Sequence, residues 1–134
     1  MIALSNSYIG NVWRTQMIKM AKAFVELPDI KPQIKQFIVN SSGESADTEI
    51  SQIENMIAAG AQAIIVNAIS PTALNPVIKK AQDAGVIVVS FDNIVTAPNV
   101  ILVNEDQVDF GRQMAQWLVD AIGGKGNVIM VTGV

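Results

Sequence analysis

The residues best suited to chemistry in this sequence stand at the ends of short apolar runs. The clearest case is the run 86–91, which is almost wholly apolar and ends abruptly in Asp92 and Asn93. An unbroken apolar run of this length is typical of a strand buried on both faces, in the centre of a parallel sheet. Polar residues also follow the other apolar runs: Ser5, Asn6 and Ser7; Asn40 and Ser41; Asn67; and Asn104.

A parallel sheet would bring these polar ends to one edge. Open α/β folds bind their ligands outside the carboxyl ends of the strands, so the sequence predicts a ligand site there. The alternative is that each residue serves an ordinary turn, because Asn, Asp and Ser favour turns for local backbone reasons. For the set as a whole, we interpret the polar ends as a binding edge.

An edge of Asn, Ser and one Asp suits a neutral ligand with several hydroxyl groups. The carboxylate of Asp92 can accept hydrogen bonds from two adjacent hydroxyls, and the amide of Asn67 both donates and accepts, as a hydroxyl does. Trp13 is expected either to cover an apolar sugar face or to pack in the core. Arg14 is expected to reach a ligand hydroxyl or to pair with Asp92, or else to be a solvated surface residue.

Composition argues against several other kinds of site. The 134 residues include no cysteine and no histidine, so thiol catalysis, histidine triads and the usual zinc sites are not expected. The net charge is −3 and the nine basic residues are scattered, which argues against nucleic-acid binding. The glycines of residues 123–126 follow a predicted helix and are expected to end it rather than to cradle a phosphate. We predict no metal site and no cofactor.

Apolar runs alternate with helical patterns along the chain. Strands are predicted at residues 2–4, 34–39, 63–66, 86–91, 100–103 and 128–134, and helices are predicted to begin near Asn11, Ser45, Ser70 and Glu105. This alternation predicts an α/β fold, a doubly wound and mainly parallel sheet with helices on both faces, of the flavodoxin-like or Rossmann-like kind.

Apolar residues at helical spacing predict which face each helix buries. The first helix would bury Trp13, Met17, Met20, Ala21 and Phe24; the second Ile50, Ile53 and Ile57; the third Leu74, Val77, Ile78 and Ala81; and the last Phe110, Met114, Trp117, Leu118 and Ala121.

Four segments together resemble the periplasmic sugar-binding proteins of bacterial ABC transporters, the group of the ribose- and galactose-binding proteins. They are residues 2–14, 60–67, 84–93 and 104–111. The resemblance implies a type I periplasmic binding protein, in which two similar lobes close on a sugar without catalysis, so that the chain is no enzyme. It also implies that Trp13 stacks on the sugar ring, that Asp92 binds its hydroxyls, and that Asn11, Arg14 and Asn67 line the cleft.

Ser7 and Asn93 complete the predicted ligand-binding set. Many members of the family have a basic residue where Asn93 stands, which leaves the identity of the sugar open. The resemblance covers about the front half of such a protein. It implies that residues 1–104 form the N-terminal sugar-binding lobe and that residues 105–134 begin the second lobe.

The resemblance also implies a membrane permease as partner and a periplasmic location, although the start of the chain has no signal-peptide pattern. A single lobe offers only half of the hydrogen-bond partners of the sugar, so we expect little or no sugar affinity from this chain alone. We also expect self-association, as in a homodimer, because residues 128–132 of the predicted last strand would expose apolar surface and unpaired edges.

Two other functions remain open at this point. A flavodoxin-like redox protein that binds flavin mononucleotide is favoured by the Ser/Asn-rich first loop and by Tyr8, Trp13 and Phe91, but the sequence lacks a clear phosphate loop. The ligand-sensing core of a LacI-type transcriptional repressor shares the predicted fold, and no DNA-binding helix pair precedes Ile2.

Overall fold

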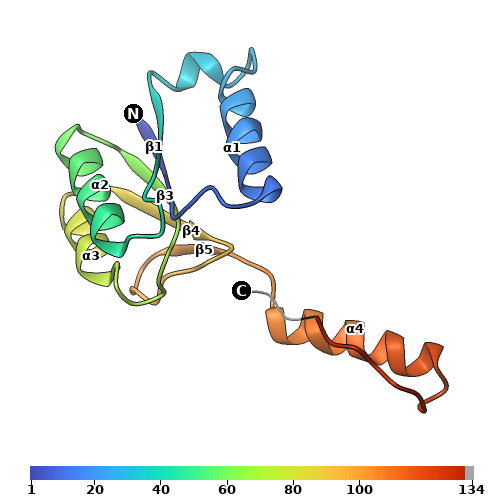
Figure 1. The fold of residues 1–134 in the computed structure, drawn as a ribbon. Coiled ribbons are helices and arrows are strands. Elements are labelled where there is room, and N and C mark those ends of the chain that lie inside the picture. The colour runs from blue at the N-terminus through green and yellow to red at the C-terminus, as the bar shows by residue number, and fades with distance from the viewer. Residues whose placement is uncertain (132–134) are drawn as a thin grey trace. The chain divides into compact units, whose positions relative to one another are not determined.

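A computed structural model of the protein, which describes residues 1–131, divides the chain into two compact units, Met1–Asn104 and Glu105–Val134. The first unit is a five-stranded, wholly parallel sheet in the order β2-β1-β3-β4-β5 (Figure 1), which confirms the predicted fold class. Its strands are β1 (Ile2–Asn6), β2 (Phe37–Ser41), β3 (Ala63–Asn67), β4 (Ile87–Phe91) and β5 (Ile101–Val103). Its helices are α1 (Val12–Val25), α2 (Ala46–Ala58), α3 (Asn75–Asp83) and the short 3-10 helix η1 (Lys31–Gln33).

The core of the first unit lies between the sheet and the helices α2 and α3, which lie side by side on one face of it (Figure 1). The sheet contributes Ala3, Ile64, Val66 and Val88, and the helices contribute Ile53, Met56, Leu74, Val77, Ile78 and Ala81. The predicted inner face of α3 is therefore confirmed. In α2, Ile53 is fully buried, while Ile50 and Ile57 pack against the core from its margin.

The opposite face of the sheet is only partly covered, and the predicted buried face of α1 is wrong. Trp13, Met20 and Phe24 are 49%, 72% and 56% exposed, and Arg14 is the buried residue of this helix. Met17 and Ala21 face the sheet across an apolar hollow of about 330 Å³. Its other walls are Leu4, Phe37, Ile65, Val89, Phe91 and Val103.

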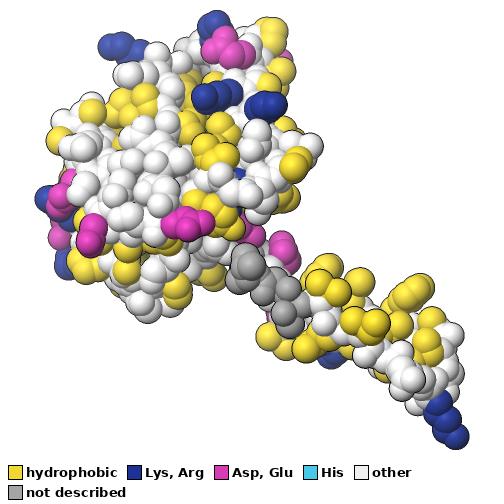
Figure 2. Space-filling model, in the orientation of Figure 1, with side chains coloured by type: hydrophobic (Ala, Val, Ile, Leu, Met, Phe, Trp, Pro, Cys, Tyr) yellow, Lys and Arg dark blue, Asp and Glu magenta, His cyan; other side chains and the backbone are white. Residues whose placement is uncertain are grey.

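The width of the sheet explains this open face. Five strands at about 4.8 Å spacing are roughly 19 Å across, whereas one helix with its side chains is about 10–12 Å wide. Two helices, α2 and α3, suffice for one face, but α1 alone cannot cover the other. Hydrophobic side chains consequently appear on the molecular surface (Figure 2).

The strand before Asp92, β4, lies inside the sheet between β3 and β5, but the prediction that both of its faces are buried is wrong. Along β4, Val88 and Ser90 are buried, whereas Ile87 is 57% exposed. The unbroken apolar run therefore does not mark a strand buried on both faces, because the α1 side of the sheet lacks a complete cover.

Two of the predicted helix starts in the first unit are confirmed and one is wrong. Asn11 and Ser45 are the N-caps of α1 and α2, and each accepts a hydrogen bond from the amide three residues on. Ser70 instead caps a turn, through the amides of residues 72 and 73. The helix α3 begins at Asn75, since Pro76 has no N–H group to donate to the carbonyl of Thr72.

The observed strand ends also differ from the predicted ends. The strand β1 continues to Asn6, and β2 begins only at Phe37, three residues after the predicted start at residue 34. Residues 128–131 of the predicted last strand form no strand, and residues 132–134 lie outside the described part. A strand needs a neighbour that pairs with its backbone, and residues 128–131 have none within the described chain.

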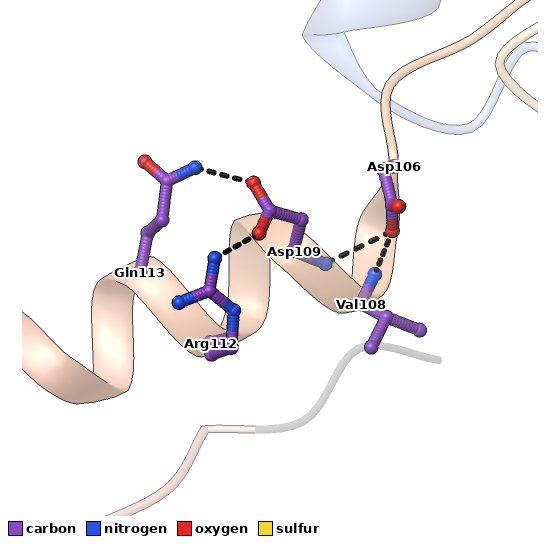
Figure 3. Close-up of polar contacts among 5 residues, drawn as sticks. All are labelled: Asp106, Val108, Asp109, Arg112 and Gln113. Atoms are coloured by element: carbon purple, nitrogen blue, oxygen red, sulfur yellow. Dashed lines mark hydrogen bonds and ion pairs between the residues drawn. The ribbon is translucent and has the colours of Figure 1, made fainter.

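The second unit contains α4 (Gln107–Ala121), which begins two residues later than predicted. Its N-cap is Asp106, whose Oδ1 accepts from the amides of Val108 and Asp109 at 3.0 and 2.9 Å (Figure 3). Two hydrogen bonds to the carboxylate hold the pKa of Asp109 below its ordinary value. The bond from Arg112 has the larger effect and the bond from Gln113 the smaller. The predicted apolar face of α4 is exposed, at Phe110, Met114 and Trp117 for example.

Replacing the two isoleucines Ile64 and Ile87 tests which face of the sheet carries the stability. We expect Ile64→Ala, in the filled core at 0% exposure, to lower the free energy of unfolding by about 2–5 kcal/mol. The matched change Ile87→Ala on the next strand should cost about 1 kcal/mol or less, because that side chain is already largely in water. Urea denaturation followed by circular dichroism measures both, and equal losses would contradict the assignment of the core.

Candidate functional site

The carboxyl ends of β1 and β3 meet the first turn of α1 around the side chain of Arg14. In the sheet register Asn6 lies beside Asn67, so their side chains project from the same face. Asn11 caps α1 by accepting from the Arg14 amide at 2.9 Å, which fixes the direction in which that turn leaves the edge. The Arg14 side chain points inward and is only 3% exposed, so its interpretation as a solvated surface residue is wrong.

Three neutral oxygens surround one end of the guanidinium. Arg14 Nη1 donates to Asn6 Oδ1 at 2.9 Å, Ser7 Oγ at 2.9 Å and Asn67 Oδ1 at 2.8 Å. Its two hydrogens are thus shared among three acceptors. Within residues 1–131 no acceptor is found for its Nε and Nη2 groups, which leaves an arginine edge able to donate to a ligand.

Asp92 joins this cluster through an amide rather than through an ion pair. Asn67 Nδ2 donates to Asp92 Oδ2 at 3.1 Å, so Asn67 bridges the guanidinium and the carboxylate. A direct pair between Arg14 and Asp92 was one of the expected alternatives, and the described structure does not contain it. No donor within the described chain reaches Asp92 Oδ1, so that oxygen can still accept a hydroxyl.

The backbone at Asp92 is in the left-handed region, with φ at +56°. Such a conformation is uncommon for residues other than glycine and costs energy that the surrounding structure must supply. It turns the chain sharply at the end of β4 and is a feature often found at binding sites.

Two aromatic rings accompany the guanidinium. The Tyr8 ring lies with its centroid 4.3 Å from Arg14 Cζ, and the Trp13 ring lies at 6.0 Å. Trp13 is half exposed, so its alternative role in core packing is wrong, and its ring remains accessible to a ligand. Gly10 makes room for Tyr8, because a Cβ at residue 10 would lie 2.4 Å from its ring.

The seven predicted site residues do not all converge. Ser7, Arg14, Asn67 and Asp92 form one hydrogen-bonded chain, with Trp13 beside it. The side chain of Asn11 serves as a helix cap. Asn93 is exposed, and within residues 1–131 it takes part only through its carbonyl, which accepts from the amide of residue 68 at 2.9 Å.

The predicted set omitted Asn6, Tyr8 and Glu49. Glu49 is completely buried: its Oε1 accepts from Ser5 Oγ and its Oε2 from the amide of Ile69, both at 3.0 Å. Burial raises the pKa of the Glu49 carboxyl above its ordinary value, against the opposing effects of these two hydrogen bonds and of the Arg14 charge. A signal was present in the sequence, since Glu49 is in phase with the buried Ile53 and Met56 on α2.

Other kinds of site find no support in the described residues. Residues 1–131 contain no group of three or more acidic, histidine or cysteine side chains placed to hold a metal ion. In the same part of the chain, no helix has the length and apolar character needed to cross a membrane.

Comparison with known proteins places the chain in a family. The sequence matches the periplasmic binding protein domain over residues 2–134. It is 29% identical to the xylitol-binding protein of Mycolicibacterium smegmatis over 73% of this chain and 28% of that protein. It is 28% identical to the ribose import binding protein of Bacillus subtilis over 99% of this chain and 42% of that protein.

A solved structure gives the same result. The crystal structure of an ABC transporter solute binding protein from Thermobispora bispora superimposes with a TM-score of 0.81 and 37% identity, over 93% of this chain and 39% of that one. The chain thus spans less than half the length of each of these three proteins. With the match extending over residues 2–134, the chain belongs to the periplasmic binding protein domain family.

Proposed function

We propose that the first unit is one face of a receptor site for a neutral polyhydroxylated molecule, a monosaccharide or related polyol. The observation that carries the proposal is the chain Arg14–Asn67–Asp92 at the carboxyl edge of the sheet. It presents cationic N–H donors at one end and a carboxylate acceptor at the other. Neighbouring hydroxyls of a sugar both donate and accept, so they match the two ends together.

Trp13 supplies the apolar part of this proposed site. Its half-exposed ring lies beside the guanidinium and can cover the C–H face of a sugar ring, while the polar chain takes the hydroxyls. The names of the two relatives support this ligand class, because one is described as binding xylitol and the other as importing ribose.

The geometry favours this ligand over a flavin phosphate. A phosphate at the start of α1 would need free amides in the first turn. The amide of Arg14 is already occupied by the Asn11 cap, and the Tyr8 ring lies against Gly10 in the same loop. The loop is therefore better suited to hold an arginine and an aromatic ring than a phosphate.

We further propose that this edge works with a second lobe, so that the ligand is held between two faces. The support is the length of the relatives, of which the chain spans less than half. In that arrangement residues 1–104 are the first lobe and residues 105–134 lead into the second. The solute receptor would act in the periplasm and deliver its ligand to a membrane permease of an ABC transporter.

A sugar titration followed by NMR tests the site with an internal control. We expect xylitol or ribose to shift the indole signal of Trp13 and the side-chain amide signals of Asn67, and to leave the indole signal of Trp117 on α4 unchanged. The affinity should be millimolar or weaker, which is about −4 kcal/mol at best, because one face leaves half of the ligand in water. Shifts at Trp117 without shifts at Trp13 would contradict the site, and a micromolar constant would contradict the need for a second lobe.

The charge of Asp92 can be tested in the same titration. We expect Asp92→Asn to abolish the ligand-induced shifts, since a hydrogen bond to a charged group is worth about 1.5–3 kcal/mol, enough to lose a weak complex. The control is Asp29→Asn, an exposed carboxylate near η1 and far along the chain from the strand ends. Unchanged ligand shifts in Asp92→Asn would rule out this carboxylate as the acceptor.

We also propose that the chain self-associates through the open apolar side that includes α1. Met20 and Phe24 are largely exposed there, next to the hollow lined by Met17 and Ala21. Sedimentation velocity should show dimers or larger species that dissociate on dilution, and Met20→Lys should shift the distribution toward monomer. The opposite change is Lys19→Met, which replaces a charge by an apolar side chain at an exposed residue of the same helix and should not favour the monomer. A wild-type protein that stays monomeric at every concentration would refute the proposal.

A further inference from the structure

The guanidinium of Arg14 is buried among neutral hydrogen-bond partners. Within residues 1–131 its bonded oxygens belong to Asn6, Ser7 and Asn67, none of which carries a charge. A buried charge that is not paired with an opposite charge needs further stabilisation. The ring of Tyr8 can supply it, because its centroid lies 4.3 Å from Arg14 Cζ.

The Tyr8 ring and the hydrogen-bond partners use different parts of the guanidinium. An aromatic ring attracts a cation through its face, and 4.3 Å is well within the distance of about 6 Å at which this attraction counts. Arginine stacks on aromatic faces with the flat side of its guanidinium, while its N–H donors point outward in the plane of the group. A contact of this kind stabilises the charge and consumes no donor. It is therefore compatible with the free Nε and Nη2 groups of Arg14.

Gly10 provides the space in which the Tyr8 ring lies. A Cβ at residue 10 would stand 2.7 Å from Cδ2 of the ring and still closer to Cε2, well inside the separation of about 3.5–4.0 Å that carbon atoms prefer. Gly10 is not among the residues with positive φ, so the close approach of the ring makes glycine necessary here rather than the backbone angle. The same addition at Gly111 on α4 would meet open space.

Asn6 fixes the ring and the guanidinium relative to each other. Its Nδ2 donates to the carbonyl of Tyr8 at 2.7 Å and to Ser41 Oγ at 3.1 Å, while its Oδ1 accepts from Arg14 Nη1 at 2.9 Å. Asn6 is completely buried at the end of β1, so both contacts start from a fixed point of the sheet. One side chain thus holds the backbone that bears the ring and the cation that the ring covers.

We propose that Tyr8, in the space that Gly10 provides, is the positioning residue of Arg14. Its ring compensates the buried charge and holds the guanidinium so that the Nε and Nη2 donors remain available at the carboxyl edge of the sheet. The role of these donors toward ligand hydroxyls rests on the function proposed above, whereas the contact between Tyr8 and Arg14 does not.

The chain has two arginines, Arg14 and Arg112, so the contact can be measured by NMR with an internal control. An aromatic ring over a guanidinium moves the Nε–H and Cδ–H proton signals of that arginine upfield. We expect this displacement for Arg14 and its retention in Tyr8→Phe, which keeps the ring. Tyr8→Ala should reduce it, and the exposed Arg112 should keep its signals throughout. Equal Arg14 signals in the wild type and in Tyr8→Ala would overturn the proposal, and so would an equal loss in Tyr8→Phe and Tyr8→Ala.

Gly10→Ala tests the same contact without removing any group that bonds or stacks. The added Cβ should displace the ring, so the Arg14 signals should move in the same direction as in Tyr8→Ala. In the double variant the methyl group meets no ring, and the signals should equal those of Tyr8→Ala alone. Gly111→Ala is the control and should leave them as in the wild type. Wild-type Arg14 signals in Gly10→Ala would overturn the proposal.

A double-mutant cycle measures the charge compensation. Tyr8→Ala and Arg14→Met should not be additive in urea denaturation, and their coupling should be about tenfold in the folding constant, as for a desolvated cation over an aromatic ring. Tyr8→Ala and Arg112→Met, a change in the second unit, should be additive. Additivity of the first pair would overturn the charge compensation. The NMR comparisons need no change at Arg14, so they decide the proposal even if Arg14→Met does not fold.

A titration with xylitol tests the consequence for the proposed site. Tyr8→Ala and Gly10→Ala should abolish the shifts of the Asn67 side-chain amide, because the guanidinium donors lose their fixed place, and Tyr8→Phe should keep them. Full shifts in Tyr8→Ala would overturn the positioning role. A wild-type protein that gives no shift with any sugar would fail the proposed function, and the sugar-free measurements would still decide the contact between Tyr8 and Arg14.

Discussion

The burial of one positive charge at the edge of a parallel sheet is the constraint on which the site depends. Arg14 is 3% exposed, and a guanidinium in that position requires oxygens at fixed places around it. The ends of β1 and β3 supply them through Asn6 and Asn67, and the Asn11 cap sets the turn of α1 that delivers the arginine. The polar character of these strand ends is thus explained by the arginine as much as by any ligand.

The sequence was sufficient to predict the parallel α/β fold and the edge at which Asn67 and Asp92 meet. Both predictions rest on local patterns, an apolar run followed by a polar end, which a parallel sheet converts directly into position. Helical periodicity was less informative for α1. It identifies the apolar face of a helix, as at Met20 and Phe24, but does not say whether another element covers that face. Coverage depends on the number of helices per face, which is a property of the whole sheet.

Arg14 and Glu49 show a second limit of sequence reasoning. An arginine one residue from the apolar stripe of a helix is ordinarily a surface residue, and an acid near the start of a helix is ordinarily explained by the dipole. Neither pattern shows that the charged side chain is buried, because burial of a charge depends on partners that only the folded chain brings together. The phase of Glu49 with Ile53 and Met56 was readable, but its partners Ser5 and Ile69 come from distant parts of the chain.

The neutral side-chain amide of Asn67 allows a positive and a negative group to share this edge of the sheet. A carboxylate in its place would pair with Arg14 directly and would stand next to Asp92, where two like charges disfavour the ionised form of both. Asn67 avoids this, since its oxygen receives the guanidinium while its nitrogen donates to Asp92. The amide therefore links the two charged groups without cancelling either of them. The side chain of Asn67 thus separates the donor groups of Arg14 from the acceptor oxygens of Asp92. Adjacent hydroxyl groups, which both donate and accept, match such a pair.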